Sequence, residues 1–185
     1  IPQNKKFVYY PLHIEQERNL LLAAPFFTNQ IELIRNIAKS LPINYKLLVK
    51  EHPAQETREW RNISDYKEIM KISNVILIHP TVPSQKILEK CSLVVTIGGT
   101  TGLEAAFYRK PSIILSEMDY SILPSVELVQ DVHKLSNKIK ESLEKEVNAN
   151  DLDRFIQIYE KNSFSFDYMD FITKYHESFY FNGNL

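Results

Sequence analysis

Five short apolar runs, separated by helical patterns, constrain the fold of this 185-residue chain more than any other feature. The runs are rich in Val, Ile, Leu and Tyr, and they are Phe7–Leu12, Tyr45–Lys50, Val75–His79, Leu93–Ile97 and Ser112–Ser116. Strands that are apolar throughout are buried on both faces, and strands that alternate with helices form parallel sheets. The sequence therefore predicts an α/β fold, a Rossmann-like parallel sheet of about five strands flanked by helices.

Polar residues mark the expected helix starts. Apolar residues recur at helical spacing over 31–41 behind Thr28, which we expect to cap the first helix. Ser64 is the expected cap of a second helix, and Ser84, which follows Pro83, is expected at the start of a third.

The character of the sequence changes after the last apolar run. An amphipathic helix is predicted over 135–143, and residues 155–181 contain ten of the twenty Phe and Tyr residues. We expect residues 1–146 to form the α/β domain and residues 147–185 to form an aromatic-rich helical tail that packs on it. A tail that contacts a further domain is the alternative interpretation.

Composition and spacing argue against several classes of function. The formal net charge is −1 with no basic run, so we expect no nucleic-acid partner. No apolar stretch approaches the ~20 residues that a spanning helix needs. The single Cys91 fits a reducing compartment, and the five histidines show no zinc spacing, so we expect no metal. A Walker A loop needs Lys after its last glycine, but Leu103 follows Gly102.

A Gly/Thr loop follows the fourth apolar run. Gly98 and Gly99 let the backbone approach a ligand closely, Thr100 adds a hydroxyl, and Gly102 lies where a short helix starts. Free backbone N–H groups at a helix start bind anions. The loop is therefore a candidate site for a phosphorylated ligand.

Two residues of this loop have an alternative explanation. Thr101 and Glu104 match the S/T-x-x-E capping box, in which the two side chains satisfy the first N–H groups of the helix. Glu104 can instead accept hydrogen bonds from ribose hydroxyls. Both interpretations remain open at this point.

A histidine follows the second apolar run, in Lys50-Glu51-His52-Pro53. Pro53 favours an extended backbone at His52, and an imidazole can donate to a phosphate. Lys50 could also reach a phosphate. The alternatives are a structural histidine, with Lys50 and Glu51 as solvated charges.

Two further segments are expected at the same edge of the sheet. The loop that starts at Ile78 and His79 and runs to the third helix contains two prolines, and its backbone is a candidate wall for a nucleobase. His13, with Glu15 and Glu17, follows the first run and is expected to face the same cleft. An ordinary turn and an ordinary polar loop are the alternatives.

The order and spacing of these motifs resemble the capsule polysaccharide biosynthesis family, which includes bacterial Kdo transferases. The resemblance spans roughly residues 7 to 120 and rests on Tyr10-Pro-Leu-His13, Leu48–Pro53, Val75–Ile78, Val94–Ala105 and Lys110-Pro111. It implies the C-terminal, donor-binding half of a GT-B glycosyltransferase of capsule or surface polysaccharide biosynthesis. The α/β domain would then bind a nucleotide sugar.

The resemblance also implies roles for individual residues. The donor would be an activated sugar, often a cytidine monophosphate (CMP) sugar. A His-Pro pair that contacts the donor phosphate maps onto His52 and Pro53, which makes His52 the candidate catalytic residue. A Ser/Thr pair maps onto Thr100 and Thr101, where several relatives carry serine. Because side-chain and backbone donors would stabilise the phosphate, we expect no cofactor and no required metal.

The resemblance places an acceptor-binding half, which usually supplies the general base, before the donor-binding half. The chain opens Ile1-Pro2, so we expect a piece of a longer protein that is inactive alone. The acceptor would be a polysaccharide or glycolipid. We expect a cytoplasmic location, with peripheral association with the membrane through partners left open.

Three alternatives are retained. The first is a uridine diphosphate (UDP) sugar 2-epimerase of the same architecture, and the second is a cytidine diphosphate (CDP) polyol phosphotransferase. The third is a non-catalytic module that binds a nucleotide sugar or a partner chain. A preference for uridine nucleotides would indicate the epimerase.

Overall fold

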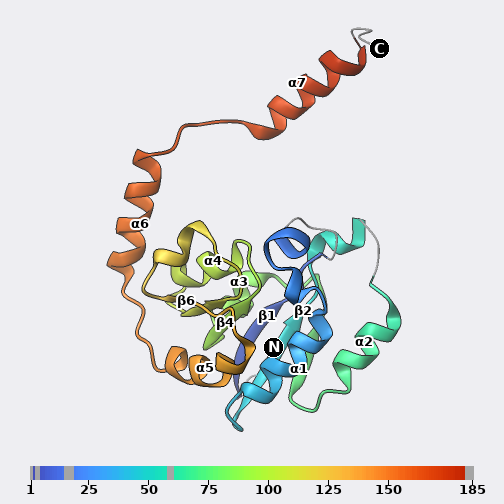
Figure 1. The fold of residues 1–185 in the computed structure, drawn as a ribbon, viewed down its shortest axis with the longest axis vertical. Helices are drawn as coiled ribbons and strands as arrows, with labels where there is room; N and C mark the ends of the chain where they lie inside the picture. Colours follow the sequence, from blue (N-terminus) through green and yellow to red (C-terminus); the bar gives the residue numbers. More distant parts are fainter. Residues whose placement is uncertain (1, 3–4, 15–18, 58–60, 182–185) are drawn as a thin grey trace. The chain divides into compact units, whose positions relative to one another are not determined.

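The computed structural model describes residues 2, 5–14, 19–57 and 61–181 (Figure 1). Its internal contacts divide the chain into two compact units, residues 1–153 and 154–185. The boundary falls inside one helix, close to the predicted boundary at residue 146. That the tail packs on the first unit remains a prediction.

The first unit is built on a parallel sheet of six strands, in the order β3-β2-β1-β4-β5-β6. The strands are β1 Lys6–Pro11, β2 Tyr45–Lys50, β3 Val75–Ile78, β4 Leu93–Thr96, β5 Ser112–Ile114 and β6 Val126–Leu128. The predicted Rossmann-like α/β fold is confirmed. The sixth strand was not predicted, because it holds only three residues, one of them Glu127.

The order of the strands reverses beside β1. The chain builds β1, β2 and β3 outward in one direction and then returns to place β4 on the other side of β1. Val8 pairs with Leu93 and Tyr9 with Val94 at this junction. In open α/β sheets ligands bind at such a switch point, outside the carboxyl ends of the strands. The ends of β1, β2 and β4 therefore mark the edge where a site is expected.

Seven helices, labelled in Figure 1, are defined in the described part of the chain. They are α1 Gln30–Ser40, α2 Ile63–Met70, α3 Ser84–Leu88, α4 Thr101–Phe107, α5 Leu135–Leu143, α6 Ala149–Lys161 and α7 Tyr168–Phe181. Shorter helical turns are Asn19–Ala23, Pro25–Phe27, Pro53–Thr57, Asp119–Ile122 and Val132–Lys134. No helix among the described residues is both long and apolar enough to cross a bilayer.

Two of the predicted helix caps are wrong. Asn29, not Thr28, caps α1, because its side-chain oxygen accepts the Glu32 N–H at 3.1 Å. Ser64 lies inside α2, which starts one residue earlier, after Asn62. Asn is as good a cap residue as Ser or Thr, so the preference for polar caps does not distinguish Asn29 from Thr28, or Asn62 from Ser64.

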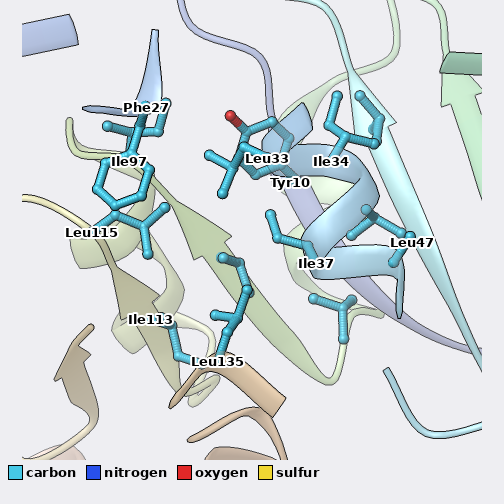
Figure 2. Packing of buried hydrophobic residues seen from close by; sticks show 14 of the residues in the cluster. Tyr10, Phe27, Leu33, Ile34, Ile37, Leu47, Ile97, Ile113, Leu115 and Leu135 are labelled. Atoms are coloured by element: carbon cyan, nitrogen blue, oxygen red, sulfur yellow. The ribbon is translucent and has the colours of Figure 1, made fainter. Parts of the chain in front are cut away.

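Helices cover both faces of the sheet. α1 and α5 pack on one face, where Ile34, Ile37 and Leu135 contact the apolar side chains of β1, β2, β4 and β5 (Figure 2). On the other face, Ile87 of α3 and Ala105 of α4 belong to a second buried cluster. Fully burying one large aliphatic side chain contributes roughly 1.5–3 kcal/mol, so the two clusters hold the strand ends in place.

The second unit is helical, as predicted, and exposes many large apolar side chains. Its aromatic rings contact one another: Phe166 lies 6.2 Å from Phe164 and 5.4 Å from Phe171, between ring centroids. Phe164 is nevertheless 83% exposed.

Candidate functional site

His13 lies where β1 ends, between the ends of β1 and β4. Its Nε2 lies 2.9 Å from the Thr96 hydroxyl and 3.3 Å from the Ile97 amide nitrogen. The residue is 9% exposed. The expectation that His13 faces an open cleft is therefore only partly met, and the alternative of a solvated polar loop is wrong for this residue. Glu15 and Glu17 lie outside the described residues.

The burial of His13 fixes its charge. Burial, together with the charges of His52 and Arg61, lowers the pKa of His13 to about 4. The ring is therefore neutral at pH 7. Because these charges act on His13, the three side chains belong to one site, although they come from three separate segments.

The Gly98-Gly99 loop is held by its carbonyl groups. The Thr96 hydroxyl donates to the Gly98 carbonyl at 2.9 Å, and the Tyr120 hydroxyl donates to the Gly99 carbonyl. Gly99 has φ +88°, which glycine adopts without strain, and a Cβ there would meet only His13 Cε1, at 3.8 Å. Within the described chain, the Gly99 and Thr100 amides make no hydrogen bond. The loop can therefore offer N–H groups to a ligand.

The predicted capping box is not formed. Helix α4 starts at Thr101, so Thr101 already lies in its first turn, and the cap residue Thr100 makes no side-chain capping bond. Instead the Thr100 hydroxyl donates to Glu104 Oε1 at 2.6 Å. The Thr101 hydroxyl makes no hydrogen bond to the part of the chain that the structure describes. Thr101 thus remains available as a donor, whereas Thr100 is bonded to Glu104.

Gly102 has a packing role that the sequence did not reveal. A Cβ at this position would lie 2.6 Å from the Tyr120 hydroxyl oxygen and 3.1 Å from Ile114 Cγ2. Its carbonyl also accepts a hydrogen bond from Ser112 at 2.9 Å. Glycine is required here because α4 approaches β5 and Tyr120 closely, and this packing is sufficient to explain the residue without a ligand.

His52 has a fixed ring orientation at the end of β2. The Ala54 amide donates to His52 Nδ1 at 3.1 Å, and the His52 amide donates to Glu51 Oε1 at 2.7 Å. Pro53 begins the helical turn Pro53–Thr57 that supplies the Ala54 donor. A neutral ring that accepts at Nδ1 carries its proton on Nε2. His52 Nε2 makes no hydrogen bond within the described chain, so it can donate to a ligand.

The expectation that Lys50 and Glu51 are solvated is wrong, since each is 2% exposed. Glu51 Oε2 accepts from Arg61 Nε at 3.0 Å and from the Tyr66 hydroxyl at 2.8 Å. Arg61 Nη2 donates to the His13 carbonyl at 3.0 Å. Arg61 therefore ties the segment after β1 to the segment after β2.

Four residues that contribute to this arrangement were not predicted. Gln30 donates to the His13 carbonyl and accepts from the His13 amide, both at 2.8 Å. Arg61, Tyr66 and Tyr120 were the others, and no motif marks any of the four in the sequence. Each acts by holding backbone or a carboxylate that is distant along the chain, which a local pattern does not encode.

The segment after β3 lies beside Lys50. Lys50 Nζ donates to Ser84 Oγ at 3.4 Å, which connects β2 to the start of α3. Ile78 is half-buried and ends β3, one residue earlier than predicted. His79 is exposed, with Nδ1 2.8 Å from the Thr81 hydroxyl. The structure therefore places Ile78, at the end of the edge strand β3, and Ser84 beside Lys50 of β2, and it leaves His79 exposed.

Two surface pockets in the first unit lie away from the candidate site. One, of about 590 Å³, is lined by residues of α1 and of the segments before β2 and β3, among them Arg35, Lys39 and Tyr45. The other, of about 390 Å³, lies beside β6 and is lined by residues such as Gln130 and Lys134. Neither contains a predicted site residue. Among the described residues, no three His, Cys, Asp or Glu side chains gather as a metal-binding group.

Comparisons with known proteins identify the family of the chain. A family model described as "Capsule polysaccharide biosynthesis protein" matches residues 1–158. The chain belongs to this family. The resemblance seen in the sequence is thus confirmed. No curated protein sequence matches the chain.

Solved structures share the fold of this family member at low sequence identity. The UDP-GlcNAc 2-epimerase of Methanocaldococcus jannaschii has a TM-score of 0.59 and 16% identity, over 88% of this chain and 47% of that one. KpsC, the beta Kdo 2,7 transferase of Thermosulfurimonas dismutans, has a TM-score of 0.53 and 16% identity, over 74% and 45%. The glycotransferase of kitacinnamycin has a TM-score of 0.51 and 17% identity, over 84% and 39%. The chain spans less than half the length of each.

Proposed function

We propose that this chain is the donor-binding part of a glycosyltransferase of capsule or surface polysaccharide biosynthesis, and that its donor is a CMP-sugar. Family membership supports the pathway. One of the structures that share its fold is a Kdo transferase. The binding site for the acceptor, a polysaccharide or glycolipid, and the general base would lie in the rest of a longer protein, which we expect to act in the cytoplasm.

The observation that carries the proposal is the open donor at His52. Its Nδ1 is occupied by the Ala54 amide, which leaves an Nε2–H beside a neutral His13 and a glycine loop with free amides. These groups are hydrogen-bond donors for an anion. In sugar transfer, negative charge develops on the phosphate that leaves, and preorganised donors stabilise it. In this proposal His52, with Thr101 and the loop amides, contacts that phosphate, and no metal is needed.

Other predicted residues take supporting positions in this proposal. The segment from Ile78 to Ser84 would form the wall beside the nucleobase. Glu104, held by Thr100, would accept hydrogen bonds from the ribose. Gly98 and Gly99 let the backbone approach the phosphate.

A UDP-sugar 2-epimerase is the second candidate. The observation in its favour is that several of the solved structures that share the fold are UDP-GlcNAc 2-epimerases, including two structures of the Methanocaldococcus jannaschii enzyme with TM-scores of 0.59 and 0.51. Both candidates use the same edge of the sheet, so the nucleotide preference distinguishes them.

The test is a titration of CMP, CDP, UMP and UDP into the isotopically labelled 185-residue chain, followed by amide chemical shifts. An incomplete site is expected to bind with Kd about 0.1–1 mM, or about −4 to −5.5 kcal/mol. Cytidine-selective shifts at His52 and Gly98–Glu104 would support the CMP-sugar proposal, and uridine selectivity would support the epimerase. Absence of shifts at millimolar concentrations of all four would count against both.

Two variants identify the site in the same titration. His52→Ala should weaken binding at least fivefold without changing the melting temperature. His133→Ala removes an exposed histidine beside β6, at the far edge of the sheet, and should leave binding unchanged. If His52→Ala lowers the melting temperature as much as the affinity, His52 has a structural role instead.

A further inference from the structure

Lys50 carries a buried ammonium group that forms no direct ion pair within the described part of the chain. The residue ends β2 and is 2% exposed. Its Nζ makes one hydrogen bond, of 3.4 Å, to the neutral hydroxyl of Ser84, and no carboxylate of the described chain lies within ion-pair distance of it. An ammonium group has three protons to donate, and burying it without an anionic partner is costly. A charge of this kind requires an explanation.

Arg61 is a second buried cation, and unlike Lys50 it forms a direct ion pair. Arg61 is 6% exposed, and it is bonded to the Glu51 carboxylate and to the His13 carbonyl. Glu51 follows Lys50 in the sequence, but its two oxygens accept from Arg61, Tyr66 and the His52 amide. The nearest carboxylate along the chain is therefore committed to Arg61, which leaves Lys50 as a cation without its own partner.

The direct hydrogen-bond partner of Lys50 is a neutral hydroxyl, and the charge of Glu51 acts on Lys50 only through space. Ser84 is half-buried and also interacts with Tyr9, whose pKa is raised to about 12, chiefly by burial. The charge of Glu104 acts on Tyr9 as well, so the first turn of α4 lies near this group. Lys50, Ser84 and Tyr9 thus form a polar group that contains one cation and no carboxylate of its own, and the charges that act on this group come from Glu51 and from Glu104 of α4.

We propose that Lys50 and Ser84 form a second anion subsite that takes a negatively charged group of the donor other than the phosphate bound by His52. This inference rests on the proposed function and narrows its substrate class to donors with two anionic groups. Two chemistries supply the second group: the second phosphate of a nucleoside diphosphate sugar, or a carboxylate on the sugar of a CMP-sugar. Lys50 recognises the charge in either case.

The experiment compares the wild-type chain with Lys50→Gln by calorimetric or NMR titration. The probes are UMP and UDP, CMP and CDP, and a CMP-sugar that carries a carboxylate on its anomeric carbon. In the wild type, the ligands with a second anion should bind about tenfold more tightly than the monophosphates. Lys50→Gln should abolish this difference and leave monophosphate affinity within twofold. If only the diphosphates bind more tightly than the monophosphates, the subsite takes a second phosphate. If only the CMP-sugar with a carboxylate binds more tightly, the subsite takes the carboxylate of the sugar.

Control variants separate the subsite from general effects. Lys86→Gln removes an exposed charge from α3, close to Ser84, and should change none of the affinities. Lys50→Met, which removes an uncompensated buried charge and keeps an apolar side chain, should raise the melting temperature while losing the tenfold preference. Equal affinities of the wild type and Lys50→Gln for every ligand would overturn the inference.

Inorganic pyrophosphate tests the subsite apart from the proposed function. If no nucleotide binds but pyrophosphate binds the wild type and not Lys50→Gln, the anion subsite stands and the nucleotide-sugar proposal fails. If nucleotides bind at His52, and the wild type and Lys50→Gln have equal affinities for pyrophosphate and for every ligand with a second anionic group, the nucleotide site stands and the subsite fails. The two failures are therefore distinguishable.

Discussion

Arg61 donates from Nε to Glu51 Oε2 at 3.0 Å, and both side chains are almost completely buried. The same guanidinium donates to the His13 carbonyl, and the same carboxylate accepts from the His52 amide. One ion pair therefore connects the backbone next to both candidate histidines. Its role is to position these histidines, and its loss should affect stability and ligand binding together.

The first prediction concerns this ion pair. Arg61→Met leaves the Glu51 carboxylate buried without its cation, which should lower the free energy of unfolding by about 3–5 kcal/mol. Urea denaturation at pH 7 measures it. Arg35→Met is the matched control, because Arg35 pairs with Glu68 at 2.7 Å on the surface. The control should have a much smaller effect. Equal losses in the two variants would show that the buried pair has no special role.

The strands show what the sequence could predict. Continuous apolar runs identify β1, β2 and β4 because both faces of the sheet are covered, and the turn residues after them place the candidate site at the carboxyl edge. The partners of the site residues were not predictable in this way. Arg61 and Tyr120 act on residues 48 and 21 positions away, respectively, through tertiary contacts. The capping-box pattern also gave the wrong result at Thr101, because the pattern alone does not show whether Thr100 or Thr101 precedes the first residue of α4.

The second prediction is a pH dependence that comes from His13. Its pKa is about 6.5 when unfolded and about 4 when folded, so the unfolded chain binds more protons between these values. Stability from this residue is fully present above pH 6.5 and is lost as the pH falls towards 4, by about 3 kcal/mol in total.

Denaturation midpoints at pH 7, 5.5 and 4.5 measure this loss. His13→Gln keeps an amide that can form hydrogen bonds but cannot titrate, so its stability should fall less with decreasing pH than that of the wild type. The carboxylates contribute equally to both curves, and the difference isolates His13. Parallel curves would mean that His13 takes up a proton as easily in the folded chain as in the unfolded one.

The third prediction concerns the tautomer of His52. Because the Ala54 amide donates to Nδ1, the neutral ring should carry its proton on Nε2. Long-range ¹H–¹⁵N correlation at pH 8 distinguishes a protonated from an unprotonated ring nitrogen. The exposed His133 provides a reference for a ring without such a bond in the described chain. A proton on Nδ1 of His52 would remove the ligand donor that the proposed mechanism uses.

The fourth prediction tests the packing of α4 against Tyr120. Gly102→Ala places a methyl group 2.6 Å from the Tyr120 hydroxyl oxygen, so overpacking should cost about 1–3 kcal/mol. Gly98→Ala is the control, because a methyl group there meets the flexible Met118 Sδ at 3.3 Å. The control should cost less, since the Met118 side chain can move aside.

A double-mutant cycle shows whether the Tyr120 hydroxyl causes the clash. Tyr120→Phe alone loses the hydrogen bond to the Gly99 carbonyl, at a cost of about 1 kcal/mol. In the Gly102→Ala background the same change removes the atom nearest to the new methyl group. The double variant should therefore be more stable than the sum of the two single losses predicts. Additive losses would show that an atom retained in Tyr120→Phe limits the space beside Gly102, either Cε2 of the ring at 3.0 Å or Ile114 Cγ2 at 3.1 Å.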